Sequence, residues 1–164
     1  MGLILRPALG VAGAYLLWRW LSGIVVVATL TGSAERIGFA CAALLPGALV
    51  LNLMIAAQML VRALSRTVDP LAGADGHFLR VNQRALTNTV EQLAGFAPAL
   101  AAFAAAAPPE RMADVLALGI VFGIARLVFW GGYLLGPLLR APGMAATFAV
   151  NVATFGAAVW AWWP

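Results

Sequence analysis

Long runs of apolar residues alternate with short polar interruptions along the whole chain. Five runs are each long enough for a membrane-spanning helix, at residues 8–30, 37–65, 79–106 or 84–106, 112–139 and 144–163. About 20 apolar residues cross a bilayer as a helix, whereas the strands of a membrane barrel alternate apolar and polar side chains, which these runs do not. The pattern therefore predicts an all-α integral membrane protein.

Prolines, glycines and polar residues mark the ends of these runs. The longest polar stretch, at 66–83, contains Asp69-Pro70 and Asp75-Gly76 and is expected to form a loop. Pro108-Pro109-Glu110 predicts a tight turn that starts the fourth helix, and Arg140-Ala-Pro142-Gly143 is expected to end that helix.

Composition supports a membrane protein without a soluble domain. Of the 164 residues, 63% are hydrophobic and only 10% are charged, whereas a soluble domain has about 25% charged residues. All ten basic residues are arginine, and the net charge is +4. In a membrane protein this excess indicates topology and contact with anionic lipid rather than nucleic acid. The single cysteine, Cys41, cannot form an intrachain disulfide.

The arginines are distributed unequally between the two sides of the predicted spans. With five spans, Arg36 and Arg111 lie on one side, and six lie on the side of the N-terminus: Arg6, Arg62, Arg66, Arg80, Arg84 and Arg140. Because cytoplasmic loops are enriched in basic residues, we expect a cytoplasmic N-terminus. The Ala- and Arg-rich usage is typical of a GC-rich genome, and we expect a multi-pass protein of a bacterial inner membrane.

A polar stripe interrupts the third apolar run at its cytoplasmic end. Arg84, Asn88 and Glu91 stand at i, i+4 and i+7, so a helix places them on one face. Glu91 lies about 10 Å deeper than Arg84 along the helix axis, and an ionised carboxylate at that depth is costly unless it is paired. The stripe is either an interfacial anchor, in which Arg84 pairs with Glu91, or part of a binding site.

The fourth run carries a second polar face. Arg126, Tyr133 and Arg140 recur every seven residues, just under two helical turns, and therefore share one face. An arginine in the middle of a span is a functional-site hypothesis by default. A structural ion pair, for example with Glu91, is the alternative for Arg126, and both can hold.

A third group, Gln58 and Arg62, forms an i, i+4 pair at the cytoplasmic end of the second run. Arg62 is either a positive anchor or a further contributor to the same site. Guanidinium groups fork onto carboxylates, a glutamate pairs with an ammonium group, and a nearby arginine lowers the pKa of a thiol. The three groups together suit a small anionic ligand such as glutathione.

The order and spacing of these residues resemble a known family of membrane proteins. The chain has Arg84-Ala-x-x-Asn88-x-x-Glu91 on one span, and Ala125-Arg126, Gly132-Tyr133 and then Arg140 on the next. These motifs are similar to those of the MAPEG family, the membrane-associated proteins in eicosanoid and glutathione metabolism. The resemblance covers about residues 45–160. It implies a homotrimer of four-helix subunits, with glutathione bound between neighbouring subunits near the cytoplasmic face.

The resemblance also implies a role for each residue. Six residues would bind glutathione or support its binding: Arg62, Arg84, Asn88, Glu91, Arg126 and Tyr133. Arg140 falls where some members carry the arginine that stabilises the glutathione thiolate, and it would be the catalytic residue. The implied activity is a membrane-bound glutathione transferase that conjugates glutathione to lipophilic electrophiles, with peroxidase activity left open.

Two features set this chain apart from the family pattern. Residues 1–36 would form an additional N-terminal transmembrane helix outside the MAPEG-like four-helix domain of 37–164, and Phe129 stands where several members have a tyrosine. The alternative to an enzyme is a non-enzymatic protein on the same scaffold that binds a lipid or a small anionic metabolite. The chain has one histidine, His77, and no cluster of metal-ligating residues at ligand spacing, so we expect no metal site.

Overall fold

The computed structural model describes residues 2–66, 69 and 73–163. These ranges contain no strand and six α-helices: α1 (Gly2–Ile24), α2 (Ser33–Ala43), α3 (Leu45–Ser65), α4 (His77–Ala106), α5 (Met112–Leu135) and α6 (Ala141–Trp162). A short 3-10 helix, η2 (Pro109–Arg111), leads into α5. The all-α fold predicted from the sequence is confirmed.

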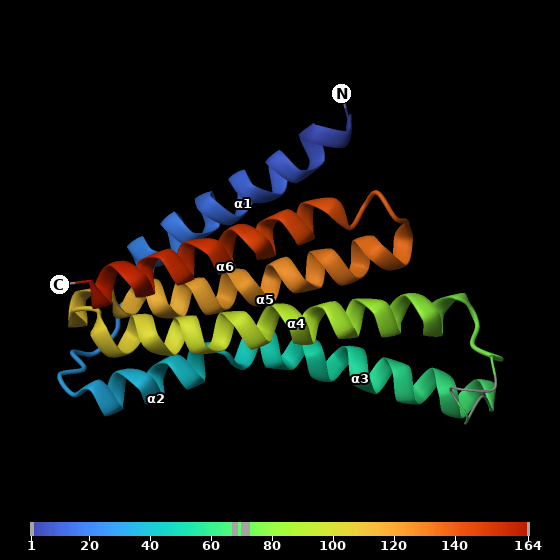
Figure 1. The fold of residues 1–164 in the computed structure, drawn as a ribbon, viewed down its shortest axis with the longest axis horizontal. Helices are drawn as coiled ribbons and strands as arrows, with labels where there is room; N and C mark the ends of the chain where they lie inside the picture. The colour runs from blue at the N-terminus through green and yellow to red at the C-terminus, as the bar shows by residue number, and fades with distance from the viewer. Residues whose placement is uncertain (1, 67–68, 70–72, 164) are drawn as a thin grey trace.

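The helices lie side by side in one elongated bundle, with α1 along the outer side of α6 (Figure 1). Helix α4 packs against α3, α5 and α6, and α1 packs against α6 and α5. The start of α1, the end of α3 and the α5–α6 connection lie at one end of the bundle (Figure 1). We call this the arginine-rich end, because Arg62, Arg80, Arg84 and Arg140 belong to it. The α1–α2 and α4–α5 connections lie at the opposite end (Figure 1).

Four stretches of the described chain are long and apolar enough to cross a membrane: Ser33–Ser65, His77–Ala106, Pro109–Leu135 and Ala141–Trp162. The chain is therefore an integral, multi-pass membrane protein. Helix α1 is the additional N-terminal helix that the sequence predicts, and it is not among the four. That α1 itself crosses the membrane stays a prediction, as does the division into domains at residue 36, a position that falls inside α2.

The second apolar run was predicted to form one span, and Ser33–Ser65 is one such stretch, although it is not one unbroken helix. The helix breaks at Leu44 into α2 and α3, because Pro46 occupies the first turn of α3 and cannot donate a hydrogen bond to the preceding turn. The first run also differs from its prediction. Helix α1 ends at Ile24, and the following stretch, 25–31, is not helical. It begins with three valines, whose branched side chains lower helix propensity.

The fourth run was predicted to be helical to residue 139, but α5 ends at Leu135. Gly136 and Pro137 follow, and this pair stops the helix one turn before Arg140. Pro142 then lies in the first turn of α6, where a proline is well tolerated, so it starts a helix rather than ending one. Arg140 consequently belongs to the α5–α6 connection and is the N-cap residue of α6.

Small residues let the helices approach closely at the centre of the bundle. A Cβ atom added to Gly119 would overlap the carbonyl of Ala43, and one added to Gly123 would lie 2.7 Å from Pro46. The rings of Phe96 and Phe122 stack beside this contact with their centroids 4.3 Å apart. Close backbone contact of this kind is how membrane helices associate without a large hydrophobic driving force.

Candidate functional site

A cleft of about 460 Å³ opens at the arginine-rich end between α4, α5 and α6. Its volume lies in the range of small-molecule sites, roughly 300–1,000 Å³. Its polar lining consists of Arg84 and Asn88 from α4, Tyr133 from α5, and Arg140. The rest of the lining is apolar: Pro7, Phe129, Ala141, Met144, Ala145 and Phe148. Four of the seven predicted site residues thus meet in one cleft.

The stripe on α4 has the arrangement that its spacing predicted. Helix α4 runs without interruption from His77 to Ala106, so Arg84 and Asn88 lie one turn apart on one face. Arg84 is exposed and makes no hydrogen bond or ion pair with the described residues. Its guanidinium group is available to a ligand.

Arg126 lies behind the cleft and is completely buried. One Nη donates to Asn88 Oδ1 at 3.1 Å and to Thr89 Oγ1 at 2.8 Å, while the other donates to Thr147 Oγ1 at 3.5 Å. Its guanidinium also stacks 4.0 Å from the ring centroid of Phe129. Arg126 therefore holds Asn88 in place from behind. Within the described chain it forms no ion pair with Glu91, and its partners are neutral hydroxyl and amide groups instead.

Aromatic rings connect this buried arginine to the exposed one at the mouth of the cleft. Phe129 and Tyr133 lie with ring centroids 5.6 Å apart, and the guanidinium of Arg140 stands 4.6 Å from the Tyr133 centroid. The heptad spacing predicted that Tyr133 and Arg140 would share one face of a helix, two turns apart. They are neighbours because the α5–α6 connection folds Arg140 back over Tyr133, and a cation over an aromatic face is stabilised by about 0.5–2 kcal/mol.

Glu91 lies beside the cleft and is not part of its lining. It is exposed on the surface of α4, and Asn88 Nδ2 donates a long hydrogen bond of 3.5 Å to its Oε2. The Asn88 side chain therefore links Arg126 on its carbonyl side to Glu91 on its amide side. An exposed carboxylate on a membrane-spanning helix is costly against lipid.

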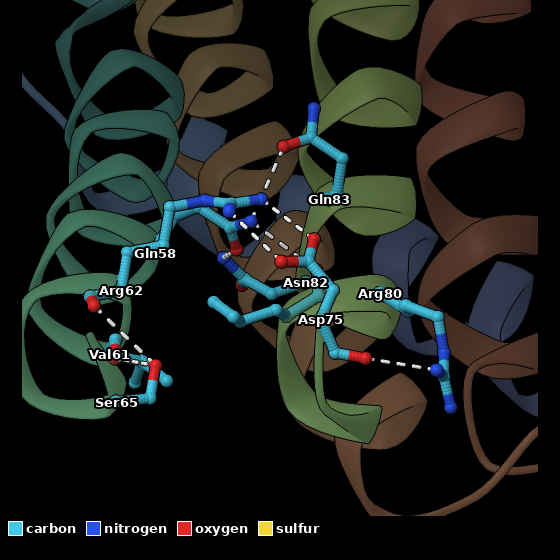
Figure 2. Close-up of polar contacts among 9 residues, drawn as sticks. Gln58, Val61, Arg62, Ser65, Asp75, Arg80, Asn82 and Gln83 are labelled. Carbon is cyan, nitrogen blue, oxygen red and sulfur yellow. Dashed lines mark hydrogen bonds and ion pairs between the residues drawn. The ribbon is translucent and has the colours of Figure 1, made fainter. Parts of the chain in front are cut away.

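Arg62 does not reach this cleft. It forms a bidentate ion pair with Asp75, with N–O distances of 2.9 and 2.7 Å (Figure 2). Arg80 donates to the backbone carbonyl of the same aspartate at 2.9 Å. These contacts attach the end of α3 to the segment just before α4. In its own chain, Arg62 thus anchors the start of the helix that carries Arg84.

A buried amide network continues this anchor into the bundle. Asn82 donates to Gln58 Oε1 at 2.8 Å and to the carbonyl of Met54 at 3.0 Å, and it accepts a hydrogen bond of 2.7 Å from Trp130 Nε1. Figure 2 shows Gln58 and Asn82 facing each other between α3 and α4. Every polar atom of the Asn82 side chain is satisfied, so the network fixes α3, α4 and α5 relative to one another.

Several residues that support the site were not predicted from the sequence. Asp75 was assigned only to a loop, and Thr89, Thr147 and Pro7 were not identified at all. Thr89 follows Asn88 directly, but a single polar residue in an apolar run does not reveal which helix its hydroxyl faces. Thr147 contacts Arg126 from α6, and Pro7 lines the cleft from α1. Both contacts depend on how helices pack, which the spacing within one helix does not determine.

Fold and site together define a helical membrane protein with a polar, arginine-lined cleft at one end of its bundle. A comparison with protein families identifies its class more closely: the model of the MAPEG family matches residues 8–160. The chain belongs to the MAPEG family. The match begins inside α1, well before the region at 45–160 on which the resemblance of the motifs rests. A search of curated proteins found no match.

Proposed function

We propose that the cleft binds glutathione and that the protein transfers its thiolate to lipophilic electrophiles supplied by the bilayer. Family membership supports this at the level of membrane glutathione and eicosanoid metabolism. The observation that carries the proposal is the pair of guanidinium groups, Arg84 and Arg140, in one cleft. Among the described residues no carboxylate is paired with either. A ligand that offers a carboxylate to one guanidinium and a thiolate to the other matches this charge distribution.

Each side chain has a specific role in this proposal. Arg84 and the amide of Asn88 bind a carboxylate and the peptide backbone of glutathione, and Tyr133 donates a further hydrogen bond. Arg140 faces the thiol, lowers its pKa and so raises the fraction of thiolate, which is the nucleophile. The thiolate then forms a C–S bond with the electrophile, whose leaving group departs with the electron pair. The apolar wall of Met144, Ala145 and Phe148 receives the electrophile.

We propose a homotrimer, the assembly that the MAPEG resemblance implies, and two charged residues exposed on a spanning helix support an interface between subunits. Glu91 and Arg84 both lie on the outer surface of α4 in the single chain. A neighbouring subunit would cover them and exclude lipid, and glutathione would then lie between subunits with its ammonium group on Glu91. Arg62, which is held by Asp75 in its own chain, would contact glutathione only from such a neighbour.

The proposed orientation places the cleft at the cytoplasmic face of a bacterial inner membrane. The cleft lies at the arginine-rich end, while Arg36 and Arg111 belong to the opposite end. Positively charged ends of spans stay in the cytoplasm. Glutathione is therefore expected to enter from the cytoplasm.

Conjugation of glutathione to a lipophilic aryl halide by the detergent-purified protein tests the transferase. We expect saturable turnover above the uncatalysed rate, and loss of turnover when Arg84 and Asn88 are both replaced by alanine. Binding of glutathione without turnover on any electrophile tested would instead favour the non-enzymatic alternative, a MAPEG scaffold that binds a small anionic metabolite or a lipid. Absence of both binding and turnover would contradict the proposal.

A further inference from the structure

A second cavity, of about 390 Å³, lies between α1 and the rest of the bundle, away from the candidate site. Tyr15 and Trp18 of α1 form one wall, and Phe103 of α4 and Leu118 of α5 contribute to the others. Arg111 and Asp114, at the start of α5, lie at its polar end. Because α4 ends and α5 begins at the opposite end of the bundle (Figure 1), this cavity faces the other leaflet from the cleft.

The cavity exists because α6 presents small side chains to α1. Ala149, Ala153 and Ala157 recur every four residues, one helical turn apart, and all three line the cavity. Protein interiors are packed to the density of crystals, and an unfilled apolar cavity loses dispersion contacts. An apolar space of this size that opens toward a bilayer is filled most directly by a hydrocarbon chain.

At the polar end of the cavity, the guanidinium group of Arg111 has N–H groups that are available to a ligand. The Nε of Arg111 pairs with Asp114 Oδ2 at 2.6 Å, while both Nη groups of Arg111 have no hydrogen-bond partner in the described chain. The Arg111 side chain is 53% exposed and that of Asp114 only 14%. A molecule that enters the cavity therefore contacts the cation of Arg111 more readily than the carboxylate of Asp114. Two parallel N–H groups match two oxygens of a phosphate.

Helix α1 also carries two buried polar groups that have no partner in the described chain. The indole N–H of Trp18 and the hydroxyl of Ser22 are buried one turn apart and have no hydrogen-bond partner among the described residues. Trp18 also lines the cavity. Buried donors without acceptors are uncommon and costly, so the α1 wall is incompletely satisfied beside the cavity.

We propose that this cavity is a binding site for one anionic phospholipid, with an acyl chain between α1 and α6 and its phosphate on Arg111. The positive charge of Arg111 favours an anionic headgroup, and the alanine-lined space accommodates the acyl chain. The lipid fills the gap between α1 and α6 and thereby completes the packing of α1. This site does not depend on the proposed transferase activity.

Native mass spectrometry of the detergent-purified protein, with phosphatidylglycerol or phosphatidylcholine added, tests the proposal. We expect one phosphatidylglycerol per chain, retained about tenfold more tightly than phosphatidylcholine, a preference of about 1.4 kcal/mol. Ala153→Leu fills the cavity and is expected to reduce retention at least about tenfold. Ala12→Leu, at an exposed position of α1 outside the cavity, is the matched control and keeps retention unchanged.

Headgroup recognition is tested separately with Arg111→Gln, which is expected to abolish the preference for phosphatidylglycerol while chain binding persists. Arg66→Gln, an exposed arginine at the arginine-rich end, is its control and keeps the preference. If Ala153→Leu does not fold, Ala149→Leu fills the same cavity from one turn away. Unchanged retention in the cavity-filling variant would overturn the site, and equal retention of the two lipids by the unmodified protein would overturn the role of Arg111.

Discussion

Arg126 shows how a membrane protein accommodates a buried cation without a carboxylate. Two hydroxyl groups and an amide oxygen surround its guanidinium, and Phe129 covers one face. Hydrogen bonds to a charged group contribute about 1.5–3 kcal/mol each. In return, the arginine fixes the amide of Asn88 with its Nδ2 side directed toward Glu91. Its contribution to the cleft is the positioning of Asn88, because it is itself inaccessible.

Arg126→Lys tests this positioning role. Lysine keeps the charge but lacks the planar fork that reaches Asn88 and Thr89 together, so the amide is released. We expect glutathione to bind roughly tenfold more weakly, equivalent to about one hydrogen bond. Calorimetry on the folded variant measures the change, and Arg66→Lys serves as the control. Unaltered affinity in a protein of lower Tm would mean that Arg126 serves stability alone.

Arg140 is predicted to contribute more to the rate of the transfer step than to the affinity for glutathione. Its guanidinium is exposed at the mouth of the cleft and is held over Tyr133 rather than by an ion pair. Arg140→Ala is therefore expected to lower kcat by about tenfold or more, with glutathione affinity changed by less than about threefold. Thiolate absorbance of the bound glutathione should fall in parallel. An equal loss of kcat and affinity would assign Arg140 to ligand binding instead.

Residue spacing predicted which residues share a face of one helix, but it did not predict the partners of Arg126, which come from other helices. Arg84 and Asn88 line the same cleft because i and i+4 positions meet on any α-helix. The anticipated partner of Arg126 was the nearby carboxylate Glu91. The actual partners include Thr147 on α6, which only the packing of α4, α5 and α6 brings within reach.

At the scale of elements, the α5–α6 connection determines the shape of the cleft. Gly132, one residue before Tyr133, touches the backbone of the connection so closely that an added Cβ would overlap the Leu139 carbonyl and approach Arg140 N to 3.0 Å. Only a residue without a side chain allows the connection to fold back onto α5. The position of Arg140 over Tyr133 depends on this contact.

Gly132→Ala and Gly131→Ala form a matched pair that tests the connection. A Cβ on Gly131 meets nothing within 4 Å, so this variant gains helix propensity and is expected to keep turnover. Gly132→Ala displaces the connection and with it Arg140, and we expect a fall in kcat of about tenfold or more. Equal activity of the two variants would show that the position of Arg140 is not set by this contact.

The sequence predicted the helices well and their ends less well. Apolar length alone located the four long stretches, because the bilayer leaves few alternatives to a helix. Prolines were harder to interpret. Pro46 interrupts the second run, which was predicted without a break, and Pro142 starts α6, although it was expected to end the preceding helix. The role of a proline depends on whether the preceding turn is already helical, and that is decided by tertiary packing.

At the scale of the whole molecule, the exposed charges on α4 predict assembly. Arg84 and Glu91 lie on the surface of a helix that is long and apolar enough to span the bilayer. Burying them against another subunit avoids the cost of placing charges in lipid. We expect a particle of three 17.1-kDa chains in mild detergent, measured by light scattering with correction for bound detergent. A monomeric mass under those conditions would contradict the interface.

The central claim is that the cleft at the arginine-rich end binds glutathione, and a calorimetric titration of the detergent-purified protein tests it most directly. We predict saturable binding with a Kd below about 1 mM. Arg84→Gln should weaken the binding roughly tenfold, as expected for loss of one charge-assisted contact, whereas the control Arg66→Gln should leave it unchanged. No binding of glutathione at millimolar concentration, or equal affinity of the two variants, would contradict the assignment of this cleft.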